Sequence, residues 1–227
     1  MPRSEVIHKY GFVRLDDCMA DDLSVVNAAR VSFGDRREKM NEADHGLIGF
    51  LMRERHGTPF EHNSFRFHVK CPIFVAREWF RHRIGSFNEM SGRYTEIENH
   101  GYVPEGDYCR AQVGKPGAYT FTPLDSDLAD EVSAVIDVQV RHAFGTYNYL
   151  LRRGVAKEVA RVVLPVGTFT EFYWTVNARA LMNFLSLRTD DTAQREIRDY
   201  AAEVERIFSI KMPVTFDFWD KGGRVCP

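Results

Sequence analysis

Residues 81–94 read RHRIGSFNEMSGRY, and the rest of the chain can be organised around them. The stretch holds three arginines, a histidine, a glutamate, an asparagine and two serines, and Gly85 and Gly92 interrupt any long regular helix. Guanidinium groups this close together repel one another unless anions lie between them, and their planar forks match phosphate and carboxylate oxygens. The stretch therefore predicts a pocket for a phosphorylated, nucleotide-like ligand. A solvated charged loop is the alternative that composition alone leaves open.

The chain has the composition of an ordinary soluble globular protein, with 44% hydrophobic and 27% charged residues among 227. This length allows one elaborated domain or two small ones, with a core that needs no disulfides. The four cysteines, Cys18, Cys71, Cys109 and Cys226, form no CxxC pair, which argues against a zinc ribbon or a secreted disulfide scaffold and favours a reducing compartment. The net charge of -2 gives no sign of a nucleic-acid partner. A polar N-terminus and the lack of a run of about twenty apolar residues argue against a signal peptide and a membrane span.

Three segments are predicted to be strands: residues 11–18, residues 65–70, where apolar and polar side chains alternate, and residues 168–176. The spacing of apolar residues predicts helices from a cap at residue 21 or 22 to residues 32–34, over 44–55, from 73 to the arginines at 81–83, and over 124–154, 156–163, 178–187 and 193–211. Residues 35–44 are expected to form a solvated loop, residues 99–123 a long irregular lid or binding loop, and the tail after Pro213 irregular structure.

Strands and helices do not alternate regularly along the chain. This order favours an α+β fold over a doubly wound parallel sheet. No GxGxxG follows a strand and no GxxxxGK[ST] occurs, so a Rossmann site and a P-loop are both unsupported.

Metal and covalent chemistry have little support in the sequence. Histidines and a carboxylate cluster at His56, Glu61, His62, His68 and His82, but no HExxH motif places ligands on one helix face. Structural roles are the simpler interpretation for His62 and His68. Ser86 and Ser91 lie in no GxSxG turn, and no cysteine has the setting of an activated thiol. The difficult chemistry would therefore fall to a cofactor.

Two further groups of basic and polar residues accompany the central one. Arg161 lies on the short helix before Pro165, and Asn177 is placed to cap the helix that carries Asn183 and Arg188. Each arginine could instead pair with a surface carboxylate, which is the commoner fate of a single arginine. Three such groups in one chain favour a shared anion site.

These motifs together resemble one family. The pattern RHR-x7-S formed by residues 81–83 and Ser91 is similar to the signature of the flavin-dependent thymidylate synthases. The resemblance extends in order over AARVS at 28–32, HGTPFEH at 56–62, SGRY at 91–94, ARVVLP at 160–165, WTVNAR at 174–179 and MNFL at 182–185 through Arg188. It covers most of the chain from about Phe12 to Pro213.

The resemblance implies an enzyme that methylates dUMP to dTMP, with 5,10-methylenetetrahydrofolate as carbon donor and FAD, reduced by NADPH, as hydride source. It implies an α+β fold of mixed helices packed on a central, mainly antiparallel sheet, in a single domain over residues 1–227. It further implies a cytoplasmic homotetramer with active sites at subunit interfaces, without a metal, a membrane or a nucleic-acid partner.

The resemblance also assigns residues to the site. FAD contacts are expected from Ser32, Thr58, Arg81, His82, Arg83, Glu89, Asn177, Arg179 and Asn183. The dUMP pocket is expected to contain Glu78, Arg81, Glu89, Met90, Ser91, Gly92, Arg93, Arg161 and Arg188. His56 and Tyr94 are expected on the folate or flavin side.

Arg188 matches the residue that polarises the uracil ring, and it is the predicted catalytic residue. A guanidinium near N3 and a ring carbonyl would stabilise the negative charge that builds as C5 becomes nucleophilic, so no cysteine attack on C6 is needed. Glu78 departs from the glutamine expected in many members, and Arg81, one turn further on, could neutralise it.

Two other functions compete with this one. Arg93, Tyr94 and the basic clusters could belong to a non-catalytic nucleotide- or RNA-binding module, against which the near-neutral overall charge weighs. A hydrolytic or metal-dependent enzyme ranks last, because the metal-ligand spacing is missing.

Overall fold

The computed structural model describes residues 6–227, whose contacts divide them into two compact units. The first unit comprises the residues up to Cys71, Val75–Glu89 and Glu171–Pro227, and the second comprises Pro72–Phe74 and Met90–Thr170. The single domain expected over residues 1–227 stays a prediction, because this division does not say whether either unit folds alone.

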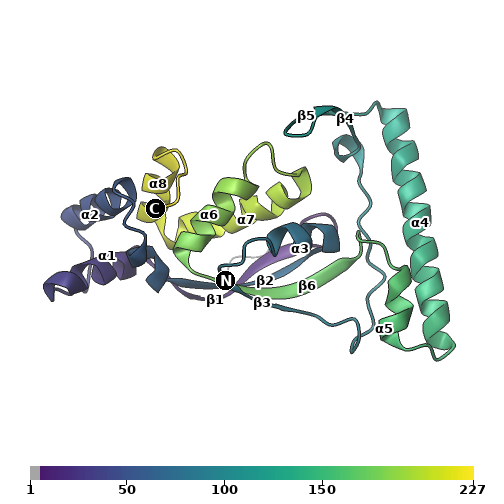
Figure 1. The fold of residues 1–227 in the computed structure, drawn as a ribbon, viewed down its shortest axis with the longest axis horizontal. Helices are drawn as coiled ribbons and strands as arrows, with labels where there is room; N and C mark the ends of the chain where they lie inside the picture. Colours follow the sequence, from purple (N-terminus) through teal and green to yellow (C-terminus); the bar gives the residue numbers. More distant parts are fainter. Residues whose placement is uncertain (1–5) are drawn as a thin grey trace. The chain divides into compact units, whose positions relative to one another are not determined.

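The first unit is built on a four-stranded sheet in the order β1-β2-β6-β3 (Figure 1). Its strands are β1 (Phe12–Met19), β2 (Ser64–Pro72), β6 (Phe169–Val176) and β3 (Ser86–Glu89). β1 runs antiparallel to β2, with Phe12 opposite Lys70, and β3 runs antiparallel to β6, with Ser86 opposite Thr175. Alternate side chains of β2 are buried, which gives the sheet one apolar face. The predicted α+β class with a mainly antiparallel sheet is confirmed, whereas β3 had not been predicted.

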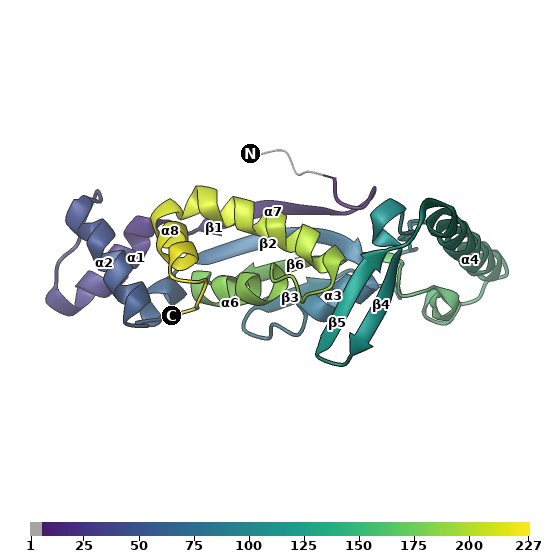
Figure 2. The same cartoon turned by 90° about the horizontal axis from the view of Figure 1, so that it is seen from above.

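Helices α6 (Ala178–Arg188) and α7 (Arg195–Lys211) lie on the apolar face of this sheet (Figure 2). The core between sheet and helices is aromatic. The rings of Trp79, Trp174 and Phe184 have centroids 4.8 to 5.3 Å apart, and all three side chains are fully buried. Trp79 ends α3 (Ile73–Trp79), so this cluster joins α3, β6 and α6. It therefore fixes these three elements against one another.

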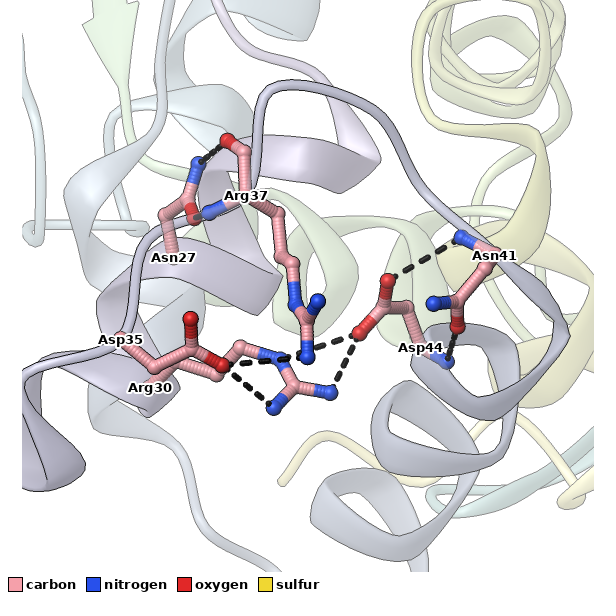
Figure 3. A network of polar contacts seen from close by, with 6 residues as sticks. All are labelled: Asn27, Arg30, Asp35, Arg37, Asn41 and Asp44. Carbon is pink, nitrogen blue, oxygen red and sulfur yellow. Dashed lines mark hydrogen bonds and ion pairs between the residues drawn. The ribbon is translucent and has the colours of Figure 1, made fainter.

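A polar network ties down the segment after α1 (Asp22–Arg30) and the 3₁₀ turn η1 (Val31–Phe33), as Figure 3 shows. Arg30 donates to Asp44 Oδ1 at 3.0 and 2.5 Å and to Asp35 Oδ2 at 3.1 Å, and Arg37 reaches the same Asp35 oxygen at 3.1 Å. Asp44 is fully buried, and the guanidinium beside it helps to lower the pKa of its carboxyl although burial opposes this. The prediction that residues 35–44 form a solvated loop is therefore wrong at the C-terminal end of this segment, where Asp44 is buried.

The capping box of Asn41 and Asp44 starts α2 (Glu42–Arg53) two residues earlier than expected. The turn η2 (Thr58–His62) follows and has proline near its start.

The irregular tail expected after Pro213 is wrong, because Pro213–Lys221 forms helix α8. The cap of this helix comes from far along the chain. The carboxylate of Asp22 accepts bonds from Val214 N and Thr215 N, each at 2.9 Å, and from Thr215 Oγ1 at 2.6 Å.

The second unit contains the long helix α4 (Ser126–Arg152), capped by Asp125 as the sequence predicts. Its core consists of Val140, Phe144, Tyr147 and Ala160, so that α4 packs on α5 (Lys157–Ala160) and the turn η4 (Arg161–Val163). The irregular excursion over residues 99–123 is wrong in its second half. After the turn η3 (Gly106–Tyr108), strands β4 (Arg110–Lys115) and β5 (Ala118–Pro123) form an antiparallel hairpin. Within residues 6–227, no helix is both long and apolar enough to cross a bilayer.

Candidate functional site

The first unit contains a cavity of about 650 Å³, a size within the roughly 300–1,000 Å³ typical of small-molecule sites. Seven of the predicted site residues line it: Arg81, His82, Arg83, Asn177, Arg179, Asn183 and Arg188. The rest of its lining is Glu61, Ile84, Ala180, Leu187 and Cys226. Sequence stretches about a hundred residues apart therefore meet in one cavity.

Helix α6 supplies one wall of the cavity because of its spacing and its cap. Asn177 Oδ1 accepts a bond from Ala180 N at 2.8 Å, which satisfies one free donor at the helix start, as predicted. Arg179, Asn183 and Leu187 follow at intervals of four residues and so share one helix face. Leu181, Phe184 and Leu185 point the other way, into the core.

The stretch after α3 supplies the opposite wall. The prediction that this helix carries residues 81–83 is wrong, because α3 ends at Trp79. The chain has to turn there into β3, which pairs with β6. Gly85 permits this turn, since a Cβ at its position would lie 2.9 Å from Trp174 Nε1 and 3.0 Å from the carbonyl oxygen of Thr175. Arg81, His82 and Arg83 thus lie on a turn and the extended chain that follows it.

The guanidinium of Arg188 is held by three hydrogen bonds, two to Glu78 in α3 and one to His82 in the turn that follows. Its Nε donates to His82 Nε2 at 3.0 Å, its Nη1 to Glu78 Oε2 at 3.1 Å, and its Nη2 to the Glu78 carbonyl oxygen at 3.2 Å. The sequence had suggested Arg81 as the partner of Glu78. In the structure the partner is Arg188 instead.

The two partners of Arg188 have shifted protonation equilibria. Burial, followed by the nearby Arg188 charge, lowers the pKa of His82 from 6.5 to about 4, so the ring is neutral at pH 7 and Nε2 can accept. Burial raises the pKa of Glu78 and outweighs the opposing effect of Arg188, while Glu196 adds to the rise.

Arg179 is held in a similar way at the other end of the cavity. Its Nη1 donates to Glu61 Oε1 at 2.6 Å and its Nε to the carbonyl oxygen of Pro227 at 2.7 Å. Gly57 leaves the necessary space, because a Cβ there would lie 2.4 Å from Arg179 Nε. Cys226 Sγ lies 3.2 Å from the carbonyl oxygen of Arg179. Neither Glu61 nor the segment around Cys226 had been predicted at the site, although Glu61 stood out among the titratable residues.

Arg81 and Arg83 differ from these two arginines. Within residues 6–227 their side chains have neither a hydrogen bond nor an ion pair, although both line the cavity. The cavity wall thus carries four guanidinium groups and one carboxylate, that of Glu61. An excess of positive charge with two unsatisfied guanidinium forks is suited to an anionic ligand with more than one charged group.

Three residues expected beside FAD do not line this cavity. Ser32 lies in η1, Thr58 begins η2, and Glu89 ends β3, all of them exposed. Thr58 follows Gly57 and so lies next to the Arg179 contact, whereas Ser32 follows Arg30 by two residues in the chain. Their roles stay predictions.

The second unit holds a separate basic group. Ser91 starts the turn that contains Gly92 and Arg93, and a Cβ at Gly92 would lie 3.3 Å from Arg161 Cδ. Arg93 lies over the ring of Tyr94, with its Cζ 5.1 Å from the centroid, and Lys157 Nζ donates to the Tyr94 carbonyl oxygen at 3.1 Å. Met90 precedes the turn. Lys157 had not been predicted to belong to this group.

His68 and His56 are held by packing and hydrogen bonds within the first unit. His68 lies 3.0 Å from Glu171 Oε2 and 2.8 Å from Arg14 Nη2, and its ring stacks on Tyr173 at 4.9 Å, which confirms its structural role. His56 packs edge-on against Phe50. In the described part of the chain, no group of three or more His, Cys, Asp or Glu side chains could hold a metal ion.

Comparisons with known proteins identify the family of the chain. A family model described as thymidylate synthase complementing protein matches residues 14–214. The flavin-dependent thymidylate synthase of Thermosipho africanus is 50% identical over 207 residues, which are 91% of this chain and 90% of that protein. That of Thermus thermophilus is 45% identical over 206 residues, or 91% and 74% of the two chains. A UMP/dUMP methylase, PolB from Streptomyces cacaoi, solved with 5-Br UMP, superposes with a TM-score of 0.89 at 44% identity, covering 96% of each chain. On these similarities the chain belongs to the family of the flavin-dependent thymidylate synthases.

Proposed function

We propose that this protein catalyses the reductive methylation of dUMP to dTMP. The carbon comes from 5,10-methylenetetrahydrofolate, the hydride from reduced FAD, and NADPH restores the reduced flavin. The observation that carries the proposal is the cavity in which Arg81 and Arg83 have no partner within the described residues while Arg179 and Arg188 are held in place. Family membership supplies the reaction that fits this cavity.

The residues of the cavity suit FAD. The diphosphate of FAD needs donors that carry positive charge, which Arg81 and Arg83 supply. The amides of Asn177 and Asn183 can bond its polar edges, and Ile84 and Leu187 provide apolar surface. Reduced FAD would supply the hydride. The proposed FAD-binding set is Ser32, Thr58, Arg81, His82, Arg83, Glu89, Asn177, Arg179 and Asn183.

Arg188 is the proposed catalytic residue. Its guanidinium would stabilise the negative charge on the uracil ring as C5 becomes nucleophilic. A cysteine nucleophile is poorly supported, because Cys226 is the thiol at the cavity and burial raises its pKa. Cys71 is fully buried, with a raised pKa for the same reason. A protonated thiol is a weak nucleophile.

The proposed dUMP-binding set is Glu78, Arg81, Glu89, Met90, Ser91, Gly92, Arg93, Arg161 and Arg188. The closeness of Gly92 to the stem of Arg161 supports a phosphate site on the turn that begins at Ser91. UMP is the second candidate substrate, because the solved relative from Streptomyces cacaoi is described as a UMP/dUMP methylase.

A homotetramer with active sites at subunit interfaces is part of the proposal. Helix α4 carries a stripe of exposed apolar residues, Leu128, Val135, Val138 and Tyr149, whose side chains are between 42% and 57% exposed. Val135, Val138 and Tyr149 follow Leu128 by 7, 10 and 21 residues, so all four lie on one side of the helix, as the contact residues of two packed helices do. Val135→Glu should therefore dissociate the assembly in size-exclusion chromatography with light scattering, and an unchanged mass would remove α4 from the interface. We place the protein in the cytoplasm, where its four free cysteines would stay reduced.

A spectrum and a product assay test the function. The purified protein should be yellow or take up FAD on titration, and NADPH should bleach the flavin with and without dUMP. Mass spectrometry should then find dTMP only when methylenetetrahydrofolate is present, with UMP assayed in parallel. Arg188→Ala should keep FAD and lose most methyl transfer. A colourless protein that takes up no FAD, or unchanged turnover in the Arg188 variant, would contradict the proposal.

A further inference from the structure

The side chain of Arg188 is more constrained than that of an arginine kept only for its charge. A guanidinium has five N–H donors, of which three are bonded to Glu78 and His82. The other two have no acceptor within residues 6–227. The side chain of Arg188 is 20% exposed and lines the cavity, and that of its partner Glu78, behind the cavity wall, is 27% exposed.

Both partners of Arg188 are themselves fixed by the aromatic core. Glu78 immediately precedes Trp79, whose ring stacks on Phe184 at 4.8 Å. The His82 ring packs edge-on against the same Phe184, with centroids 4.9 Å apart. Phe184 lies one turn before Arg188 on α6. His82 and the chain neighbour of Glu78 therefore pack on one buried side chain of the helix that carries Arg188.

We propose that Glu78 and His82 are positioning residues, which fix the Arg188 guanidinium so that its two remaining N–H donors face the ring of the bound nucleotide. The inference rests on the proposed function, in which Arg188 acts on a uracil ring. Donors that are already oriented need no reorganisation when charge develops on the ring. This preorganisation is how they would raise the rate of the reaction. His82 suits this role because it is neutral and can accept, whereas an imidazolium would repel Arg188.

This inference changes the role of Glu78. As a direct ligand of the nucleotide, its carboxylate would lie near a phosphorylated, negatively charged molecule. As a positioning residue, it needs only an acceptor atom for Arg188 Nη1, which a glutamine also provides. The two roles differ in what Glu78→Gln and Glu78→Ala should do.

The experiment is a double-mutant cycle between Glu78 and Arg188 on the FAD-loaded protein. Single-turnover rates of product formation and calorimetric affinities for dUMP are measured for the wild type, E78Q, E78A, R188A and E78A/R188A. We expect E78Q to stay within about threefold of the wild-type single-turnover rate and E78A to lose about tenfold to a hundredfold in that rate, with a smaller change in the affinity for dUMP. In the R188A background, E78A should change the rate by less than about twofold. Asp217→Ala, which removes an exposed partner of Lys221 on α8, serves as the control carboxylate and should match the wild type.

Three outcomes would overturn the inference. E78Q could be as slow as E78A, which would make the charge essential. E78A could have the same effect with and without Arg188, or could weaken the affinity for dUMP at an unchanged single-turnover rate, and either result would indicate direct contact with the nucleotide. If the wild type itself takes up no FAD or forms no dTMP, the proposed function fails instead, and the two failures are distinguishable.

A second measurement needs no turnover. NMR titration of the histidine rings should show the pKa of His82 rising above about 4 in R188A, because the cation beside the ring is gone while burial still lowers the pKa. The same value in both proteins would mean that ring and guanidinium are not in contact, and would overturn the inference even if E78A does not fold.

Discussion

Replacing Asp22 by asparagine should destabilise the first unit far more than its position at the start of α1 suggests. The buried carboxylate accepts bonds from Val214 N, Thr215 N and Thr215 Oγ1 at 2.9, 2.9 and 2.6 Å. An asparagine can keep its oxygen toward Thr215 but turns an amide donor toward Val214 N–H. A buried donor without an acceptor costs about 1–3 kcal/mol, and the remaining bonds weaken because the charge is gone. We therefore expect a loss of about 2–4 kcal/mol in the free energy of unfolding.

The neighbouring Asp21 provides a matched control. It is exposed and accepts from Ser24 N and Ser24 Oγ at 2.6 and 2.7 Å, within its own helix. Asparagine caps helices about as well as aspartate, so Asp21→Asn should cost less than about 0.5 kcal/mol. Urea denaturation of both variants at one protein concentration measures the difference. Equal losses would refute the view that Asp22 acts as the cap of α8. The Asp22 variant should also lose FAD more readily, because α8 leads to Pro227, which holds Arg179.

Three further predictions concern the cavity. Asn177→Ala should cost about 1 kcal/mol of stability by urea denaturation and also weaken FAD binding, whereas Asn177→Asp keeps the cap and loses only FAD affinity in a fluorescence titration. Gly57→Ala should raise the dissociation constant for FAD about tenfold by displacing Arg179, while Gly46→Ala, in open space on α2, should leave it unchanged. The pKa of His82 falls from 6.5 to about 4 on folding. The contribution of neutral His82 to the free energy of unfolding is therefore complete above pH 6.5 and is lost as the pH falls toward 4. For a half-exposed ring this amounts to about 1–2 kcal/mol, which thermal unfolding between pH 7 and 4.5 should show and His82→Gln should abolish.

The elements that the sequence predicted well carry their signals locally. Strand β2 alternates buried and polar side chains, α6 begins with its own cap at Asn177, and α4 begins with Asp125 and ends before Gly154, which has a φ of +78°. In each case the residues that decide the structure lie within the element or next to it. Tertiary contacts did not have to be known.

Two elements were missed for different reasons. The β4–β5 hairpin had a visible signal, because Pro116 and Gly117, with a φ of +84°, form the two-residue turn between Lys115 and Ala118. Glycine and proline had been taken there as signs of irregular chain. Helix α8 had a weaker local signal, because Pro213 stands at its first position but the preceding residue, Met212, provides no side-chain cap. Its cap is Asp22, about 190 residues away in the sequence, and only the folded unit brings that carboxylate to Val214 and Thr215.

The cavity residues also divide into those that local sequence could place and those that only tertiary packing brings to the site. Arg179 and Asn183, four residues apart, could be placed on one helix face from their spacing, and residues 81–83 could be placed together from their composition. Arg188 is half a turn away from Arg179 around the helix, so spacing alone does not bring it to the cavity. Glu61 and Pro227 could not, because both reach Arg179 only through the packing of η2 and the chain end against α6. The partner of Glu78 was misjudged for a similar reason. Its neighbour along the chain, Arg81, lies beyond the end of α3, while Arg188 arrives from another helix.

The four arginines of the cavity resolve the choice between a surface network and an anion site. If all four were paired with carboxylates, the cluster would be neutral and would need no ligand; if none were, mutual repulsion would oppose the fold. Glu61 and Glu78 pair with Arg179 and Arg188 only, and within residues 6–227 Arg81 and Arg83 stay unpaired. Two unpaired guanidinium groups match the two negative charges of a diphosphate. In the proposed site the carboxylates would therefore not compete with the ligand but would hold the other two arginines in place.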